Sequence, residues 1–402
     1  MFAQTILLPA FAIITAVAAQ SATICSQPTA TINSNADASQ YSSCSSISGD
    51  VVIGSTASGI IQLDGPETIG GDLTILNATA LTSFSSSSIA QIKGTFHAED
   101  LTLLSTLSMS VLTAVKTIEF ISLPNLGSLT FSSVVTEANS VTVSNTFLSS
   151  LVGLNVTTVQ TLQIDNNPHL VEFTSQAGNI SSAAVFDANG AGLVVSFPSL
   201  TWAANLTFRD VGSVALPSLQ VINGSLGFYE NTLSSISCPN LTSVGDFATG
   251  VGSLAFVDNT QLTNISMNAL KSVGGADQIA NNTILNGISF PALVDVGGAI
   301  DFSGNFTTPQ LPALGNVKGG FNVESKQAID CDSFKAEASS SGVIQGKFVC
   351  AGSLSTVSSL GSGTATGSGA TATGSKGAAV SYGINEAAAG LSVLGGLLQM
   401  LL

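Results

Sequence analysis

Apolar residues recur along the middle of the chain in short alternating runs and not in long stretches. From about residue 47 to 350, Ser, Thr, Asn or Gly interrupts the runs of Leu, Ile, Val and Phe within a few residues. Alternation with a period of two is typical of strands that bury one face. The pattern therefore predicts a folded, largely β middle region built of many short strands.

A repeating frame organises these runs in the second half of the chain. The segments 216–224 (LPSLQVING), 290–298 (FPALVDVGG) and 311–319 (LPALGNVKG) carry Pro, Leu, a β-branched residue and Gly at matching positions. A short alternating run then ends in Asn, as in Ser225–Asn231 and Leu254–Asn259. The spacing of the frame leucines is typical of leucine-rich-repeat coils. These leucines are Leu200, Leu219, Leu241, Leu270, Leu293 and Leu314, at intervals of 19 to 29 residues.

One such coil cannot bury its apolar face alone, so we expect the coils to stack in register around one long core. Alternate strand residues, such as Leu226 and Phe228, would point inward. We expect Pro at one corner, Gly with a positive φ angle at the next, and stacked Asn side chains that satisfy turn amides. Connecting segments rich in Ser, Thr and Val argue against a helix in each coil. The predicted fold is a mostly β, right-handed, leucine-rich-repeat-like β-solenoid.

The two ends of the chain carry targeting signals. Residues 6–19 form an apolar stretch with small residues at its end, which predicts a secretory signal peptide. Residues 387–402 form an apolar tail that follows a stretch of Ser, Gly, Thr and Ala. Small residues, a spacer and a terminal apolar tail together predict attachment of a glycosylphosphatidylinositol (GPI) lipid.

These signals divide the chain and set its location. Ser375 and Gly377 are candidate attachment residues, because each leaves a spacer close to about 8–12 residues before the tail. The lipid would hold the mature protein at the extracellular face of the plasma membrane, in the cell wall, or in both. The predicted segments are a signal peptide (1–19), a solenoid ectodomain (20–350), a stalk (351–379) and a propeptide that is removed (380–402).

Five cysteines fit a secreted protein. We expect disulfides between Cys25 and Cys44 and between Cys331 and Cys350, since each pair closes a short loop. The two pairs lie at the ends of the predicted solenoid, where its open edges need caps. The fifth, Cys238, would be a small buried apolar residue at a repeat position.

Nine Asn-x-Ser/Thr sequons are spread along the predicted ectodomain. In a secreted chain such a series predicts N-linked glycans, and an occupied sequon has to be exposed. The sequons therefore also mark predicted outward positions. The candidates are Asn77, Asn155, Asn179, Asn205, Asn223, Asn240, Asn264, Asn281 and Asn305.

A resemblance to a known family is carried by six stretches: Ile47–Ile53, Asn205–Asp210, Val221–Phe228, Val296–Phe306, Phe321–Ser325 and Gly346–Cys350. With these stretches the chain resembles the fungal GPI-anchored cell-wall proteins with receptor L-domain-like repeats, the family of sporulation-specific and cell-wall-organisation proteins. The resemblance runs from about Cys25 to Cys350 and includes both terminal signals. It implies a surface glycoprotein needed for wall integrity and morphogenesis, with no catalytic residues to carry over. A division of the ectodomain into two L-domain-like halves near 175–200 stays open.

Composition and charge narrow the possible partners. With 8% charged and 45% hydrophobic residues the chain first suggests a membrane protein, but a stacked core accounts for the dispersed apolar residues. Glycans and hydroxyl side chains would keep the surface hydrated. The net charge is −15, and none of the nine basic residues is next to another. This distribution excludes binding to nucleic acid or to a membrane through clustered cations.

The two histidines do not indicate catalysis. His97 lies in an alternating run and His169 at a repeat corner. Neither is accompanied by a nucleophile motif, so we interpret both as structural. Trp202 is interpreted as a core or corner aromatic, and Arg209 as the partner of Asp210 in a local ion pair.

Acidic residues offer the one serious enzymatic alternative. A glycosidase needs two carboxylates roughly 5–10 Å apart. Asp165, Glu172 and Asp187 recur about one coil apart, so the prediction is that they could stack on one face. We interpret them as solvated surface acids, because isolated surface carboxylates are common.

The predicted function is that of a non-enzymatic, GPI-anchored surface glycoprotein that supports fungal cell-wall organisation, integrity and morphogenesis. The expected partners are the GPI lipid of the outer leaflet and cell-wall glucan. No cofactor, metal, nucleic acid or small-molecule substrate is expected. Two alternatives stay open, a carbohydrate- or peptide-binding receptor-like ectodomain and a wall glucan-modifying glycosidase.

Overall fold

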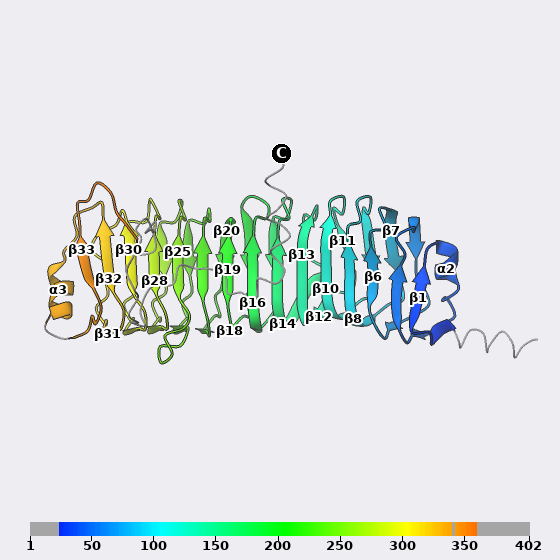
Figure 1. Cartoon of the computed structure of the whole chain (residues 1–402), viewed down its shortest axis with the longest axis horizontal. Coiled ribbons are helices and arrows are strands. Elements are labelled where there is room, and N and C mark those ends of the chain that lie inside the picture. The colour runs from blue at the N-terminus through cyan, green and yellow to red at the C-terminus, as the bar shows by residue number, and fades with distance from the viewer. Residues whose placement is uncertain (1–23, 340–341, 360–402) are drawn as a thin grey trace, which may run out of the picture.

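Parallel strands stack from one end of the molecule to the other. The structure is a computed structural model that describes residues 24–339 and 342–359. It confirms the predicted mostly β solenoid, which has about 14 coils. One 24-stranded sheet runs along the molecule, with α2 (Asn35–Ser39) at one end and α3 (Asp332–Ser339) at the other (Figure 1). Within the described residues, no helix is long and apolar enough to cross a bilayer.

Each coil contributes one strand to the longest row of the sheet, here called the main ladder. Neighbouring strands are parallel and in register, so that Phe208 lies between Phe186 and Phe228. The strands are β1 (Thr29–Ile32), β3 (Asp50–Ile53), β6 (Leu73–Leu76), β8 (Gln91–Glu99), β10 (Ala114–Leu123), β13 (Ser140–Thr146), β14 (Leu154–Asp165), β16 (Asn179–Asp187), β19 (Leu206–Arg209), β22 (Leu226–Tyr229), β25 (Leu254–Val257), β28 (Asp277–Ala280), β30 (Ile300–Gly304), β32 (Phe321–Ser325) and β33 (Phe348–Ala351).

Very short strands form a second row of the same sheet. The long strands β8, β10, β14 and β16 pair in both rows, and their register shifts between the two parts. The remaining strands of this row are β2 (Ser46–Ile47), β5 (Thr68–Ile69), β12 (Val135–Glu137), β18 (Trp202–Ala203), β21 (Val221–Ile222), β24 (Ser243–Val244), β27 (Ser272–Val273), β29 (Asp295–Val296) and β31 (Asn316–Val317).

Three smaller parallel sheets make a third face. They contain four, three and two strands. This face is interrupted, since its strands belong to three separate sheets. Its strands are β4 (Ser58–Gln62), β7 (Ala80–Ser86), β9 (Thr106–Met109), β11 (Leu129–Thr130), β15 (Glu172–Thr174), β17 (Leu193–Ser196), β20 (Val211–Ala215), β23 (Ser235–Ser237) and β26 (Asn264–Ser266).

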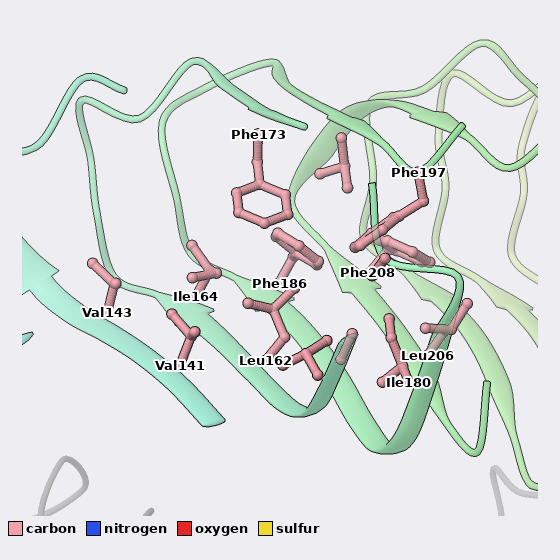
Figure 2. Packing of buried hydrophobic residues seen from close by; sticks show 14 of the residues in the cluster. Val141, Val143, Leu162, Ile164, Phe173, Ile180, Phe186, Phe197, Leu206 and Phe208 are labelled. Atoms are coloured by element: carbon pink, nitrogen blue, oxygen red, sulfur yellow. The ribbon is translucent and has the colours of Figure 1, made fainter. Parts of the chain in front are cut away.

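The faces enclose one continuous apolar core, as the alternating pattern predicts. Leu226 and Phe228 are fully buried, and Figure 2 shows the same inward rows in the middle coils, from Val141 and Val143 to Leu206 and Phe208. Stacking in register places like side chains on top of one another. Four aromatic rings form such a stack, with neighbouring centroids 5.8, 5.3 and 4.9 Å apart: Phe186, Phe208, Phe228 and Phe256.

Asparagines stack at the corner that follows the main ladder. Oδ1 of Asn259 accepts from the backbone N–H of Asn231 at 3.0 Å and from its Nδ2 at 2.9 Å. Nδ2 of Asn259 in turn donates to the Phe228 carbonyl at 3.0 Å and to Oδ1 of Asn282 at 3.1 Å. The predicted role of stacked Asn side chains is therefore confirmed here. Because all three are buried, each link satisfies groups that water does not reach.

Glycine at the corner before the main ladder is required by close packing. A Cβ atom on Gly297 would lie 2.0 Å from the carbonyl oxygen of Gly274, and one on Gly319 would lie 2.5 Å from that of Gly298. Gly297 and Gly319 do not have positive φ angles, so the expected reason for Gly was wrong at these two positions. Gly245, which takes the same place in its coil as Gly297, has a φ of 73° and confirms the expectation there. Positive φ also occurs after the main ladder, at non-glycine residues such as Asp258 (59°). Asp and Asn tolerate this conformation better than most residues.

Disulfides lie near both ends, as predicted. Cys25 pairs with Cys44 beside α2. Cys331, just before α3, pairs with Cys350 in β33. Each spans 19 residues and limits the freedom of a terminal coil that has a neighbour on one side only. Cys238 is free and fully buried, which confirms its predicted packing role, and burial raises the pKa of its thiol to about 12.

One buried acid breaks the apolar pattern of the core. Asp277 takes the inward position that Leu254 and Ile300 occupy in the neighbouring strands. Its side chain is fully buried, and neither carboxyl oxygen has a hydrogen-bond partner in the described part of the chain. Burial raises the pKa of this carboxyl to about 8. The folded protein therefore holds Asp277 protonated at neutral pH.

Replacing Asn259 by Ala should destabilise the solenoid. The substitution removes the acceptor of two Asn231 donors and the donor to the Phe228 carbonyl. Because each unpaired buried group costs about 1–3 kcal/mol, we expect the free energy of unfolding in urea to fall by about 3 kcal/mol. The exposed neighbour Thr260 gives a matched control, Thr260→Ala, which should change it by less than about 0.5 kcal/mol. An equal loss of unfolding free energy in Asn259→Ala and Thr260→Ala would contradict the stabilising role of the Asn stack.

Replacing Asp277 by Asn should make the protein less sensitive to pH. The carboxyl titrates near 3.8 in the unfolded chain and near 8 in the folded one, so between these values only the unfolded chain releases the proton. Stability should therefore fall by about 1.4 kcal/mol per pH unit as pH rises through this window. Asn imitates the neutral acid and removes this dependence. The free energy of unfolding of both proteins is measured by urea titration at pH 4 and at pH 8. If the difference in this free energy between the two proteins is the same at both pH values, the raised pKa of Asp277 is contradicted.

Candidate functional site

The outer face of the main ladder is the candidate functional surface. Because strands alternate, two residues per strand point away from the core and form two columns along the solenoid. Column one contains Thr74, His97, Glu119, Thr142, Gln163, Val185, Thr207, Gly227, Ala255, Gln278, Asp301 and Asn322. Column two contains Leu76, Glu99, Ile121, Ser144, Asp165, Asp187, Arg209, Tyr229, Val257, Ala280, Ser303 and Glu324.

His97 lies on this face between two acids. Its Nε2 is 2.9 Å from Oε2 of Glu99, and its Nδ1 is 3.6 Å from Oε2 of Glu119 on the next strand. The predicted position in an alternating strand is confirmed. These contacts make His97 a link between neighbouring coils, and this structural role accounts for the residue without catalysis.

A charged cluster occupies column two further along. Nε of Arg209 is 3.6 Å from Oδ1 of Asp187, and its Nη1 donates to Glu230 in the following coil. The guanidinium carbon lies 5.3 Å from the ring centroid of Tyr229. The expected pair with Asp210 was wrong, because that residue turns the corner with a φ of 56°. Glu230 was missed, although it follows Arg209 by one coil length.

Two of the three predicted acids lie side by side. Asp165 and Asp187 are register partners on β14 and β16. Glu172 lies on β15 in the third face, so the prediction that all three could stack on one face was wrong. Nε2 of Gln163 donates to Asp165 at 2.6 Å, and the Ser144 hydroxyl donates to it as well. These contacts hold the Asp165 carboxylate along the sheet.

The pKa of Asp187 is raised above its ordinary value. Burial is the main cause, and the nearby carboxylates of Asp210, Asp165 and Glu230 act in the same direction. Arg209 opposes the rise without cancelling it. The cluster therefore combines a restrained carboxylate with a more basic one.

The two remaining aromatic candidates lie away from these columns. His169 is exposed at the corner after the main ladder, where its ring centroid is 3.8 Å from that of Phe147. Trp202 is half-buried in β18 and pairs with Asn179 and Val221. The structure thus places His169 at a corner, as predicted, and Trp202 within the second row.

All nine sequons lie in the described part of the chain, and none belongs to either column. Seven of the nine asparagines are exposed, while Asn155 and Asn305 are half-buried. They lie at the corners, in the second row or, for Asn264, on the third face. The glycosylation of these residues stays a prediction. If it occurs, the outer face of the main ladder is the face that carries no N-glycan.

Other predicted elements lie outside the described residues. These are the signal peptide, the candidate attachment residues Ser375 and Gly377 and the propeptide. Among residues 24–339 and 342–359, no group of three His, Cys, Asp or Glu side chains is placed to hold a metal ion.

Comparison with known proteins identifies the family. Residues 5–42 match the Ecm33 family, described as GPI-anchored cell wall organization protein. Over 323 residues the chain is 42% identical to Protein ecm33 of Aspergillus fumigatus, covering 80% of this chain and 79% of that protein. It is 38% identical over 322 residues to a cell surface GPI-anchored protein of Arthroderma benhamiae, covering 80% and 81%.

A more distant relative agrees with this assignment. The chain is 34% identical over 339 residues to the cell wall mannoprotein PST1 of Saccharomyces cerevisiae, covering 80% of this chain and 71% of that protein. No solved structure matches the chain significantly. The family resemblance inferred from the repeats and terminal signals is thereby confirmed. The chain belongs to the Ecm33 family of fungal GPI-anchored cell wall organisation proteins, which are located at the cell surface and in the wall.

Proposed function

We propose that the protein supports cell-wall organisation as a non-enzymatic, rigid glycoprotein that becomes linked to wall glucan. The observation that carries this proposal is the continuous, in-register solenoid, whose sequon asparagines are exposed or half-exposed along much of its length. A stacked rod keeps its shape because each coil is held by its neighbours. Glycans on such a rod would hydrate it within a polysaccharide matrix.

Linkage to wall glucan is consistent with the predicted GPI attachment at the C-terminus. GPI attachment near Ser375 or Gly377 would place a lipid-linked glycan at the end of the stalk. Transfer of the protein to wall glucan, by cleavage of a bond within the anchor glycan and release of the lipid-bearing remainder, would fix the rod covalently without a glucan-binding pocket. The receptor-like alternative instead requires the solenoid itself to bind a carbohydrate or peptide.

The glycosidase alternative has one supporting observation. Asp165 and Asp187 stand on neighbouring strands, which are about 4.8 Å apart, and retaining glycosidases hold their two carboxylates about 5–5.5 Å apart. However, Asp165 is engaged by Gln163 and Ser144, and Asp187 by Arg209. Both lie on the outside of a sheet, where a sugar chain is not enclosed. The contacts therefore favour a structural role for the pair.

A complementation experiment separates these functions. A strain that lacks the gene should become sensitive to wall-perturbing dyes, and the full chain should restore resistance. The double variant Asp165→Asn with Asp187→Asn should restore it fully, because a structural role does not need ionised carboxylates at these positions. A chain that ends before residue 380 should be secreted and should fail to restore it.

Wall fractionation provides the control. Equal amounts of wild-type protein and double variant should be released from washed walls by a β-glucanase. If the variant reaches the wall in normal amounts but does not restore resistance, the result supports the glycosidase alternative and contradicts the proposed non-enzymatic role. If neither a GPI-specific phospholipase nor the glucanase releases the wild-type protein, the linkage to lipid and glucan is wrong.

A further inference from the structure

The chain folds back over the sheet after it leaves the C-terminal cap. β33 ends at Ala351, and the backbone N–H groups of Ser353 and Leu354 then donate to the carbonyls of Gln327 and Ser325, at 2.8 and 3.2 Å. These bonds hold the chain at the corner that follows β32. From this corner the chain turns onto the outer face of the main ladder.

Polar side chains of both columns hold the returning segment. Nδ2 of Asn322 donates to the Ser358 carbonyl at 3.0 Å, and the Ser358 N–H donates to Oε2 of Glu324 at 2.8 Å. The Ser359 hydroxyl donates to Oδ2 of Asp301 at 2.6 Å. The contacts move from β32 to β30 within two residues, so the segment runs backward along the solenoid.

The next contact continues this course. Nε2 of Gln278, on β28, donates to the Ser359 hydroxyl at 3.0 Å. Asp301 and Asn322 are buried to 3% exposure although they belong to the outward column one, and all five residues of β30 are buried. The equivalent outward residues Thr142 and Ser144 of β13 are half-exposed. The segment 352–359 is therefore packed onto the sheet.

The position of this segment decides where the predicted anchor leaves the solenoid. Ser359 lies over β28 and β30, several strands inside the C-terminal end, and on the face without sequons. The sequons of the C-terminal half, such as Asn264, Asn281 and Asn305, lie on another face or at corners. Glycans there would keep the other faces away from a bilayer. The outer face of the main ladder has no sequon asparagine in either column, so Ser359 can approach a bilayer there with predicted glycans only at the bordering corner, at Asn281 and Asn305.

We propose that residues 352–359 are a strap that fixes the anchor-bearing segment on the outer face of the main ladder, so that this face lies toward the bilayer that carries the lipid. The solenoid then lies along the membrane, and its glycans point outward. From the proposed function this inference takes the lipid anchor and the predicted N-glycans, and it concerns the protein before any transfer to wall glucan.

Hydrogen exchange tests the strap on the full chain. The double variant Asn322→Ala with Glu324→Ala removes both side chains that hold Ser358. Amide exchange in residues 352–359 should become about tenfold faster or more, while the strands keep their protection. Gln163→Ala with Asp165→Ala is the matched control, because it removes an amide and a carboxylate from the same two columns of β14. Equal acceleration in both variants, or none in the first, would overturn the strap.

Lipid quenching tests the orientation of the anchored protein. The fluorophore is attached to Thr142→Cys, in column one, or to Thr106→Cys, which is exposed on the third face. Selective labelling is feasible because Cys238 is the only free thiol and is fully buried. On phosphatidylcholine vesicles with a headgroup quencher, the Thr142 label should be quenched and the Thr106 label should not.

The strap variant completes this test. Adding Asn322→Ala with Glu324→Ala should abolish the difference between the two labels, whereas the β14 control should keep it. Equal quenching of both labels in the otherwise wild-type chain would overturn the orientation, although the strap itself would stand on the exchange data. Failure of the protein to bind vesicles at all would contradict the lipid anchor and, with it, the orientation.

Discussion

Parallel pairing of each coil with the next, residue for residue, is the constraint on which the rest of this structure depends. It places Phe186, Phe208, Phe228 and Phe256 in one stack and lets each Asn side chain serve the backbone of its neighbour. It also sets the glycine corner, where backbones meet too closely for a Cβ atom. The outward columns follow from the same register, since a slip by one residue would exchange core and surface.

Much of the fold could be predicted because inward positions leave a direct trace in the sequence. An apolar residue at every second position marks a strand, and the recurring Pro, Leu, Gly and Asn mark the corners. The buried positions of Leu226, Phe228 and Cys238 follow from that pattern, and both disulfides follow from the short loops that the cysteine pairs close. The repeat pattern and the two terminal signals are thus sufficient to recognise a member of the Ecm33 family from its sequence. Asp277 was not predicted, since one acid in a core position imitates an ordinary surface residue.

The outward face was harder to predict, because its contacts join residues from different coils. Coil length varies, so Arg209 meets Glu230 after 21 residues, whereas Asn231 meets Asn259 after 28. No fixed spacing identifies such partners. Glu172 was placed wrongly because the chain turns a corner within the seven residues after Asp165. The Ser-rich segment after Ala351 has no apolar pattern, so nothing in its composition indicated that it returns to the sheet.

The returning segment has a mechanical consequence at the cell surface. Turgor, growth or shear would pull on the anchored end, and this tension would reach the hydrogen bonds of Ser358 and Ser359 before it reached β33. These bonds break and re-form without damage to the fold. Further tension would pass through Cys350 to its covalent partner Cys331. The C-terminal end therefore first gives way reversibly at the hydrogen bonds, and the disulfide then resists further tension before the last coil unravels.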